Sequence, residues 1–170
     1  MSGPSPLVLC STSAAETRKV AAALASVCRP GDVLLLSGGL GAGKTTFAQG
    51  FGAGLGVAEA ITSPTFTLVR RYPIDDHRVA AFVHADVYRL DHLHEVTDLG
   101  LGELVGDGGV ALVEWGHVAE TVLGEGALTV GLEPDPDQDE HRRISVGPAD
   151  ESWSARWVAL EHALDPWRDR

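Results

Sequence analysis

Residues 38–46, GGLGAGKTT, combine glycines, a lysine and hydroxyl side chains in the order G-x-x-x-x-G-K-[ST]. Glycines permit backbone conformations that other residues avoid, so consecutive N–H groups can turn inward around an anion. A helix that begins directly after the loop adds its positive N-terminus to the same place. The pattern is typical of a P-loop that cradles nucleotide phosphates. The predicted phosphate-binding residues are Gly38, Gly41, Ala42, Gly43, Lys44, Thr45 and Thr46.

Two side chains of this loop are suited to the chemistry of a nucleoside triphosphate. Lys44 is placed to reach the β- and γ-phosphates, and the Thr45 hydroxyl to ligate a magnesium ion that bridges them. A chain with 20 glycines will sometimes place two of them in this register by chance. Lysine is scarce, however, since it occurs only as Lys19 and Lys44, and the second falls where the motif requires it. We therefore predict ATP or a related nucleotide with Mg²⁺ as the ligand.

A carboxylate at the end of a neighbouring buried strand is the second part that a P-loop site needs. The stretch VALVEWGH, residues 110–117, runs apolar for four residues and then presents Glu114. A glutamate at a strand end can also be a solvent-exposed residue without a role in chemistry. The short stretch alone does not distinguish that role from metal binding. Together with the loop upstream, it predicts that Glu114 holds magnesium.

Asp86, in HADVYRL, also follows a short apolar run. Its neighbours His84, Tyr88 and Arg89 can bond or polarise phosphate and water. The alternative is a turn or edge aspartate without chemistry. The residues alone leave the role of Asp86 open, and it stands beside Lys44 and Glu114 as a third catalytic candidate.

Three further residues near these motifs have open roles. Ser63 and Thr65 of SPTF carry hydroxyls in the segment where many P-loop proteins keep a nucleotide-sensing switch, although Ser-Pro-Thr is also ordinary turn chemistry. Trp115 is as well suited to the core as to a functional role. No N-K-x-D element that reads guanine occurs, which favours adenine.

Hydrophobic spacing predicts the elements that position these residues. The uninterrupted apolar run VLLLS before the loop is typical of a strand buried on both faces. The expected strands lie at 33–37, 65–72, 81–90, 110–113, 127–134 and 141–147. The expected helices lie at 11–28, 45–55, 90–105 and 152–164, with 90–105 forming one or two. We therefore predict an α/β fold, a single P-loop NTPase domain over residues 1–170 with a mixed central sheet flanked by helices.

Composition limits the function classes. Thirteen Lys+Arg against 24 Asp+Glu give a net charge of −11, which repels a phosphate backbone and disfavours direct nucleic-acid binding. Cys10 and Cys28 have no metal-binding spacing, and no signal-peptide pattern opens the chain, so a cytoplasmic location is expected. No apolar run is long enough to span a bilayer, so we expect no membrane association.

The motifs GGLGAGKTTFAQGFGAGLG, SPTFTLVRRY, HADVYRLD, LGLGELV and VEWG occur in an order and spacing that resembles the bacterial TsaE family, over essentially the whole chain. The resemblance implies an ATPase of threonylcarbamoyladenosine formation on tRNA, acting with the proteins TsaD and TsaB. It also implies magnesium residues at Thr45 and Glu114 and a candidate catalytic or metal-linked acid at Asp86, and it matches Trp115. One departure is Gly39, where the family usually has aspartate, which leaves any role of that carboxylate in doubt.

Two other functions remain open at this stage. A small-molecule P-loop kinase would use Arg70, Arg71 or Arg89 to clamp a phosphoryl acceptor, but no acceptor pocket or arginine-rich lid is evident in the sequence. An ATP-dependent adaptor would bind nucleotide and hydrolyse it negligibly by itself. Phosphate release and phosphate transfer distinguish these possibilities.

Overall fold

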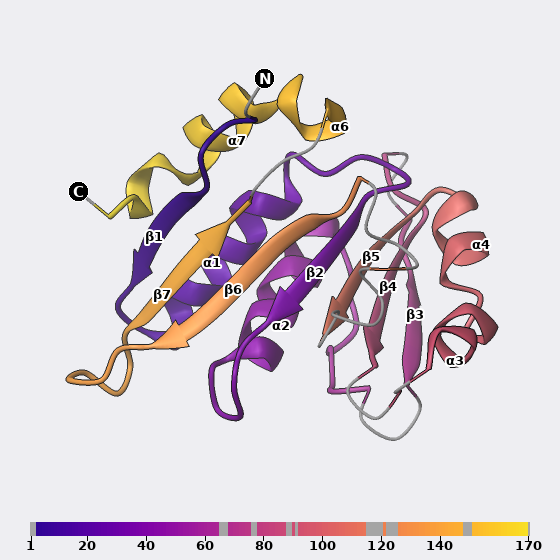
Figure 1. Cartoon of the computed structure of the whole chain (residues 1–170), viewed down its shortest axis with the longest axis horizontal. Helices are drawn as coiled ribbons and strands as arrows, with labels where there is room; N and C mark the ends of the chain where they lie inside the picture. The colour runs from indigo at the N-terminus through magenta and orange to yellow at the C-terminus, as the bar shows by residue number, and fades with distance from the viewer. Residues whose placement is uncertain are drawn as a thin grey trace.

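A computed structural model describes residues 3–64, 68–75, 78–87, 90, 92–114, 121, 126–147 and 151–169 (Figure 1). These residues form a seven-stranded mixed sheet with the order β1-β7-β6-β2-β5-β4-β3. The four central strands β6, β2, β5 and β4 run parallel to one another, and β3 and β7 run antiparallel to them. The strands are β1 (Leu7–Ser11), β2 (Val33–Ser37), β3 (Val69–Pro73), β4 (Ala81–Asp86), β5 (Gly109–Glu114), β6 (Leu128–Pro134) and β7 (Arg142–Val146).

Helices lie on both faces of the sheet. The helices are α1 (Ala14–Ala25), α2 (Lys44–Leu55), α3 (Leu93–Asp98), α4 (Leu101–Gly106), α6 (Glu151–Ser154) and α7 (Trp157–Leu164), followed by the 3₁₀ turn η1 (Asp165–Trp167). In Figure 1, α1 and α2 lie side by side behind the strands, and α3 and α4 lie beside β3, β4 and β5. The predicted α/β fold with a mixed sheet between helices is confirmed.

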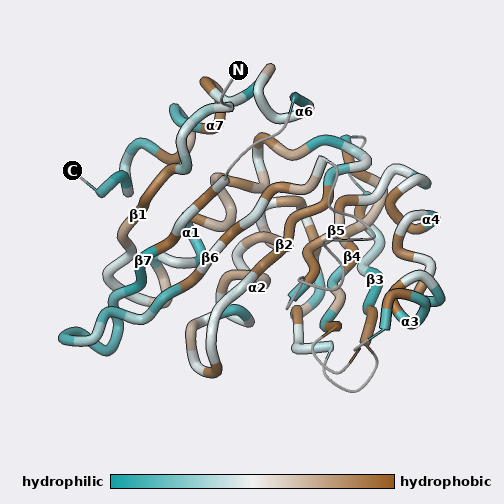
Figure 2. The backbone as a smooth tube through the Cα atoms, viewed as in Figure 1, coloured by the Kyte–Doolittle hydropathy of each residue, from teal (hydrophilic) through white to brown (hydrophobic). Residues whose placement is uncertain are grey.

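Alternate residues of the central strands pack into two cores, as the two-residue period of a strand requires. Leu34, Leu36 and Leu112 face the larger core, which α1, α2 and α7 complete. Leu35 and Val113 face a smaller core completed by α3 and α4. Because helices cover both faces of the central strands, these strands consist of nearly continuous apolar residues, as their sequence and the brown colouring in Figure 2 show.

Glycines allow α1 and α2 to approach each other closely. A Cβ added at Gly50 would lie 2.3 Å from the Arg18 carbonyl oxygen, and one at Gly54 would lie 2.7 Å from Ala22 Cα. In isolation these glycines lower helix propensity. In this fold they determine how closely α2 packs against α1. Helix α2 is the helix that follows the glycine loop.

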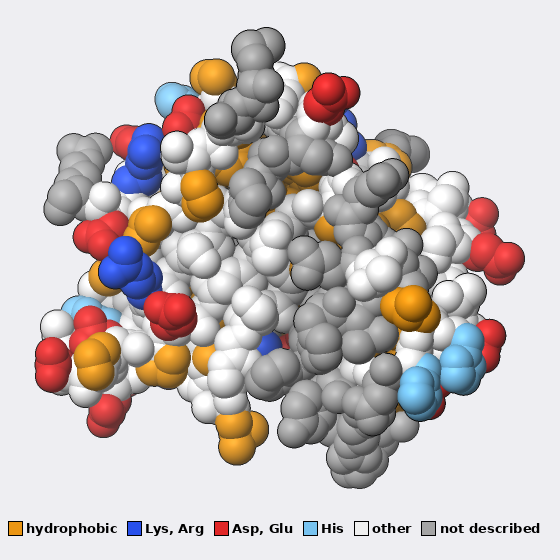
Figure 3. All heavy atoms as spheres, in the orientation of Figure 1, with side chains coloured by type: hydrophobic (Ala, Val, Ile, Leu, Met, Phe, Trp, Pro, Cys, Tyr) orange, Lys and Arg blue, Asp and Glu red, His pale blue; other side chains and the backbone are white. Residues whose placement is uncertain are grey.

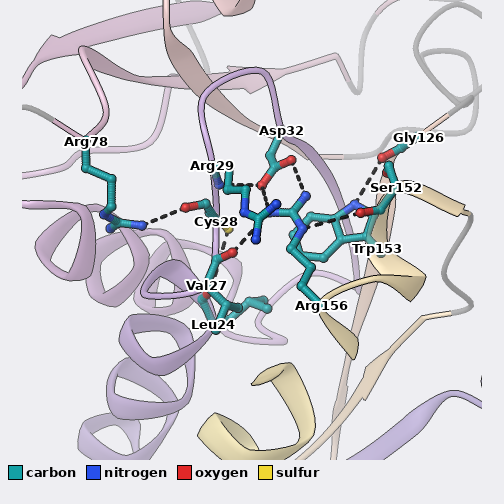
Figure 4. A network of polar contacts seen from close by, with 10 residues as sticks. All are labelled: Leu24, Val27, Cys28, Arg29, Asp32, Arg78, Gly126, Ser152, Trp153 and Arg156. Carbon is teal, nitrogen blue, oxygen red and sulfur yellow. Dashed lines mark hydrogen bonds and ion pairs between the residues drawn. The ribbon is translucent and has the colours of Figure 1, made fainter. Parts of the chain in front are cut away.

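A largely buried ion pair joins the C-terminal helices to the connection between α1 and β2 (Figure 4). Arg156 donates two hydrogen bonds to Asp32, at 2.7 and 2.5 Å, and one to the Val27 carbonyl at 3.0 Å. The guanidinium also lies 3.8 Å from the centre of the Trp153 ring. This bidentate pair fixes the chain just before it enters β2.

Some elements differ from the sequence-based expectations. Strand β1 was not anticipated; it lies at the sheet edge, where it pairs antiparallel with β7. The predicted strand at 81–90 ends at Asp86, and the predicted helix at 152–164 is divided at Arg156. Among the described residues, no helix has the length and apolar character that a bilayer crossing requires.

Candidate functional site

Sheet topology brings the predicted carboxylates together at one edge. Parallel pairing sets Glu114, the last residue of β5, opposite Leu36 of β2 on one side and Asp86 of β4 on the other. The carboxyl ends of these three strands therefore meet where the glycine loop leaves β2, the usual ligand crevice of α/β sheets. Lys44 interacts electrostatically with Asp86 and with Glu114, which lie 42 and 70 positions further along the sequence.

The loop backbone has the conformation that an anion cradle needs. Gly41 and Gly43 have φ of 77° and 99°, which side chains disfavour. Gly38 lies so close to β6 that a Cβ would come within 2.8 Å of the Leu132 carbonyl oxygen. Only glycine fits these three positions without strain or displacement.

The start of α2 is left open to a ligand. In α1, Ser13 caps the helix by accepting a hydrogen bond from the Glu16 N–H at 3.1 Å. Helix α2 instead has Gly43 as its N-cap residue, with no side-chain cap among the described residues and no acidic residue in its first turn. Its first N–H groups and its positive helix end thus point to a place suited to an anion.

Lys44 is directed back over the loop. Its Nζ donates hydrogen bonds to the carbonyl oxygens of Gly38 at 2.7 Å and Gly39 at 3.0 Å. Partial burial lowers the pKa of Lys44 below its usual 10.5, while the charges of Glu114 and then Asp86 act in the opposite direction. The ammonium is therefore hydrogen-bonded to the loop and is affected by the charge of both carboxylates.

Glu114 is buried, with its side chain 3% exposed. Its Oε2 lies 3.2 Å from Nε2 of His84, which is fully buried on β4. Asp86, at the end of the same strand, is half-buried, and its backbone N–H donates to the Leu68 carbonyl at 2.8 Å. Leu68 has a φ of 62°, unusual for leucine, so a strained backbone position holds Asp86.

The oxygen atoms at this edge fit a magnesium ion that also binds phosphate. In the described part of the chain, no three His, Cys, Asp or Glu side chains are grouped to hold a metal by themselves. Mg²⁺ in nucleotide sites normally has one or two protein oxygens and takes its other ligands from phosphates and water. Thr45, exposed at the start of α2, and Glu114 match that small donor set.

Arg142, at the start of β7, was not identified from the sequence. Its Nε donates to the Ala42 carbonyl at 2.9 Å and its Nη2 to that of Gly41 at 3.3 Å, so it holds the loop against the β6–β7 hairpin. The two segments are about a hundred residues apart, and no local pattern signals the contact.

A pocket of about 220 Å³ lies beside this arginine. Its lining residues come from the start of α1, from the loop and α2, and from the hairpin: Ala14, Thr17, Gly43, Thr46, Asp139, Glu140 and Arg142. The hairpin adds many of the acidic side chains that gather at the lower left of Figure 3.

The other residues that the sequence analysis named lie either outside the described residues or in places where their side chains have no direct role in the site. Thr65, Trp115 and Arg89 lie outside the described residues. Gly39 is exposed, and a Cβ there would meet nothing within 4 Å. Arg70 donates to the Thr62 hydroxyl at 2.6 Å and lies over the Tyr72 ring, so it is engaged within its own neighbourhood.

The sheet order, the glycine loop and the adjoining helix together define a P-loop α/β fold. A family model described as "Threonylcarbamoyl adenosine biosynthesis protein TsaE" matches residues 11–144. The chain belongs to the TsaE family, as its motifs predicted.

Individual relatives agree with this assignment. A Bacillus subtilis protein named tRNA threonylcarbamoyladenosine biosynthesis protein TsaE is 43% identical over 124 residues, which are 73% of this chain and 75% of the relative. A Streptomyces coelicolor protein of the same name is 40% identical over 147 residues, 84% and 97% of the two chains. The crystal structure of Bacillus subtilis YdiB is similar with a TM-score of 0.76 and 33% identity, covering 93% of this chain and 95% of that one.

Proposed function

We propose that the protein is a magnesium-dependent ATPase that supports threonylcarbamoyladenosine formation on tRNA. The observation that carries this proposal is the start of α2, which has no side-chain cap among the described residues and is flanked by Lys44. The charges of Glu114 and Asp86 act on that same lysine. An open helix start, an ammonium and two strand-end carboxylates are the parts that a nucleoside triphosphate with Mg²⁺ requires.

Each of these side chains has a distinct role in the proposal. Lys44 exchanges the Gly38 and Gly39 carbonyl oxygens for phosphate oxygens when the nucleotide binds. Thr45 and Glu114 supply oxygen atoms for Mg²⁺, Glu114 through water. A bound Mg²⁺ would offset the negative charge of the phosphates. Asp86 orients the attacking water and accepts its proton.

The pocket beside Arg142 is the proposed place for the nucleoside. It adjoins Gly43 and Thr46, so a nucleotide with its phosphates on the loop extends into it. Its lining includes the small residues Ala14 and Gly43, which leave room for a flat ring. The absence of an N-K-x-D sequence favours adenine as that ring.

We further propose that the protein acts in the cytoplasm with TsaD and TsaB and reaches tRNA only through them. The names of the relatives support the pathway. The net charge of −11 disfavours direct contact with the RNA backbone, so a protein partner has to carry the RNA-binding surface. Among the described residues, we identify no water-orienting glutamine or arginine finger, which predicts feeble hydrolysis in isolation.

The test measures steady-state phosphate release by the chain alone, with TsaB, with TsaD and with both. We expect weak release alone and strong release with both partners. Thr45→Ala and Glu114→Ala should each lower magnesium-dependent release, by about 10–100-fold for a partner of the bound metal. Glu103→Ala, at an exposed glutamate of α4, is the matched control.

Full activity of the isolated chain would contradict partner activation, and unaltered magnesium dependence in Glu114→Ala would contradict the metal site.

The same assay tests the two alternative functions, an adaptor and a small-molecule kinase. Negligible hydrolysis even with both partners would favour an adaptor, and transfer of labelled phosphate to a metabolite would favour a kinase. The contacts of Arg70 disfavour that residue as the clamp of a kinase.

A further inference from the structure

We propose that His84 is a positioning residue for Glu114, holding its carboxylate in the orientation that magnesium binding needs. The inference rests on the proposed function, because it gives the magnesium role of Glu114 a structural cause. His84 precedes Asp86 on β4 by one strand repeat, so both side chains and Glu114 lie on the same face of the sheet.

The direction of the hydrogen bond follows from the two groups. Nε2 of His84 lies 3.2 Å from Oε2 of Glu114, and both side chains are buried. An ionised carboxylate only accepts hydrogen bonds, so the ring nitrogen is the donor and carries the hydrogen. Among the described residues, His84 is the side chain that hydrogen-bonds Glu114. This bond engages Oε2, one of the two oxygen atoms of the Glu114 carboxylate.

Packing alone does not account for a histidine at this position. The ring stacks on Phe82, with centroids 5.8 Å apart and planes 14° from parallel. Its other nitrogen, Nδ1, is buried with no hydrogen-bond partner in the described residues. A buried polar atom without a partner lowers stability, and an apolar ring would stack on Phe82 without that cost. The Nε2 donor is the property that an apolar ring lacks.

The His84 donor also holds Glu114 against the attraction of the Lys44 charge. Glu114 and Lys44 interact electrostatically across the site. Without its His84 bond, the Glu114 carboxylate is drawn toward the Lys44 ammonium and away from the place where the metal would bind. A carboxylate that ligates a metal is normally held by such a hydrogen bond, and its loss typically lowers metal affinity or activity about 10–100-fold.

Three substitutions test this role. His84→Phe keeps a ring for the stack on Phe82 but has no donor. His84→Gln places an amide N–H near the former Nε2, whereas His84→Asn carries the same amide too short to reach Glu114. The last two form a matched polar pair, so the test stands even if His84→Phe fails to fold.

The readout is ADP affinity by titration calorimetry, with Mg²⁺ and with EDTA, together with thermal unfolding of each variant. We expect every folded variant to keep the wild-type affinity in EDTA. The gain in affinity that Mg²⁺ brings should fall about tenfold or more in His84→Phe and His84→Asn and return in His84→Gln. In a Glu114→Gln background the His84 substitutions should have no further effect, because His84 acts through that carboxylate.

The outcomes separate this inference from the function on which it rests. If Glu114→Gln loses the magnesium gain while His84→Phe and His84→Asn both keep it, His84 is only a packing residue and the inference is wrong. If the wild type shows no magnesium gain, or Glu114→Gln keeps it, the magnesium site itself is wrong and both proposals fail.

Discussion

Replacing Gly50 by alanine should destabilise the protein, although it lies in the middle of a helix. Helix propensity alone predicts the opposite sign, since alanine is favoured over glycine by about 1 kcal/mol in a helix interior. In α2, however, the new Cβ would lie 2.3, 2.5 and 2.7 Å from three backbone atoms of Arg18. A backbone cannot rotate away as a side chain does, so α1 and α2 have to separate.

The loss of stability expected for Gly50→Ala follows from how far the two helices have to separate. Ordinary contact begins at 3.4 Å, so the shortest of these distances has to grow by roughly 1 Å. Overpacking of a core costs about 1–3 kcal/mol, and a backbone clash belongs at the upper end. After subtraction of the propensity gain, we expect the free energy of unfolding to fall by about 2 kcal/mol, or about 4–8 °C in Tm for a chain of this size.

Urea denaturation followed by circular dichroism measures the change. Gly102→Ala in α4 is the matched control, because a Cβ there meets nothing within 4 Å, and its stability should stay the same or rise slightly. A lower midpoint for Gly50→Ala with an unchanged m-value is the expected result. If Gly50→Ala is as stable as Gly102→Ala, the close packing of α1 on α2 does not limit the residue at position 50.

The remaining predictions concern the site and the N-terminal helix. Lys44→Ala should lose about 10- to 150-fold in ATP affinity by calorimetry, because a charge-assisted hydrogen bond contributes about 1.5–3 kcal/mol; unaltered binding and hydrolysis would remove the P-loop assignment. Asp86→Asn should bind ATP as the wild type does but release phosphate about 100-fold more slowly with both partners present; failure to fold would mark Asp86 as structural instead. Hydrogen bonds from Trp167 and then from Lys19 hold the pKa of Glu16 below its usual 4.5, so its stabilising contribution is fully present above that value and is lost as the pH falls through the lowered one. The difference in Tm between wild type and Glu16→Gln should therefore shrink on acidification below pH 4.5, and a difference that grows there would contradict the assigned contact.

Local patterns in the sequence were sufficient for the parts of the site that are contiguous along the chain. The strand at 33–37, the loop and the helix after it depend on short-range periodicity and on glycine backbone freedom, and the structure has them where they were predicted. Glu114 was identified because a carboxylate ends an apolar run, which is also a local signal.

Contacts between distant segments were decided only by the tertiary structure. The α1–α2 approach reverses the apparent cost of Gly50, and sheet pairing places Asp86 opposite Glu114. The contact of His84 with Glu114 joins residues 30 apart, and that of Arg142 with the loop joins residues about 100 apart. A histidine in an apolar strand and an arginine after an acidic turn have no periodic signature of their partners. Their roles arise from strand order and register, which are set by the packing of the whole sheet rather than by neighbours in the chain.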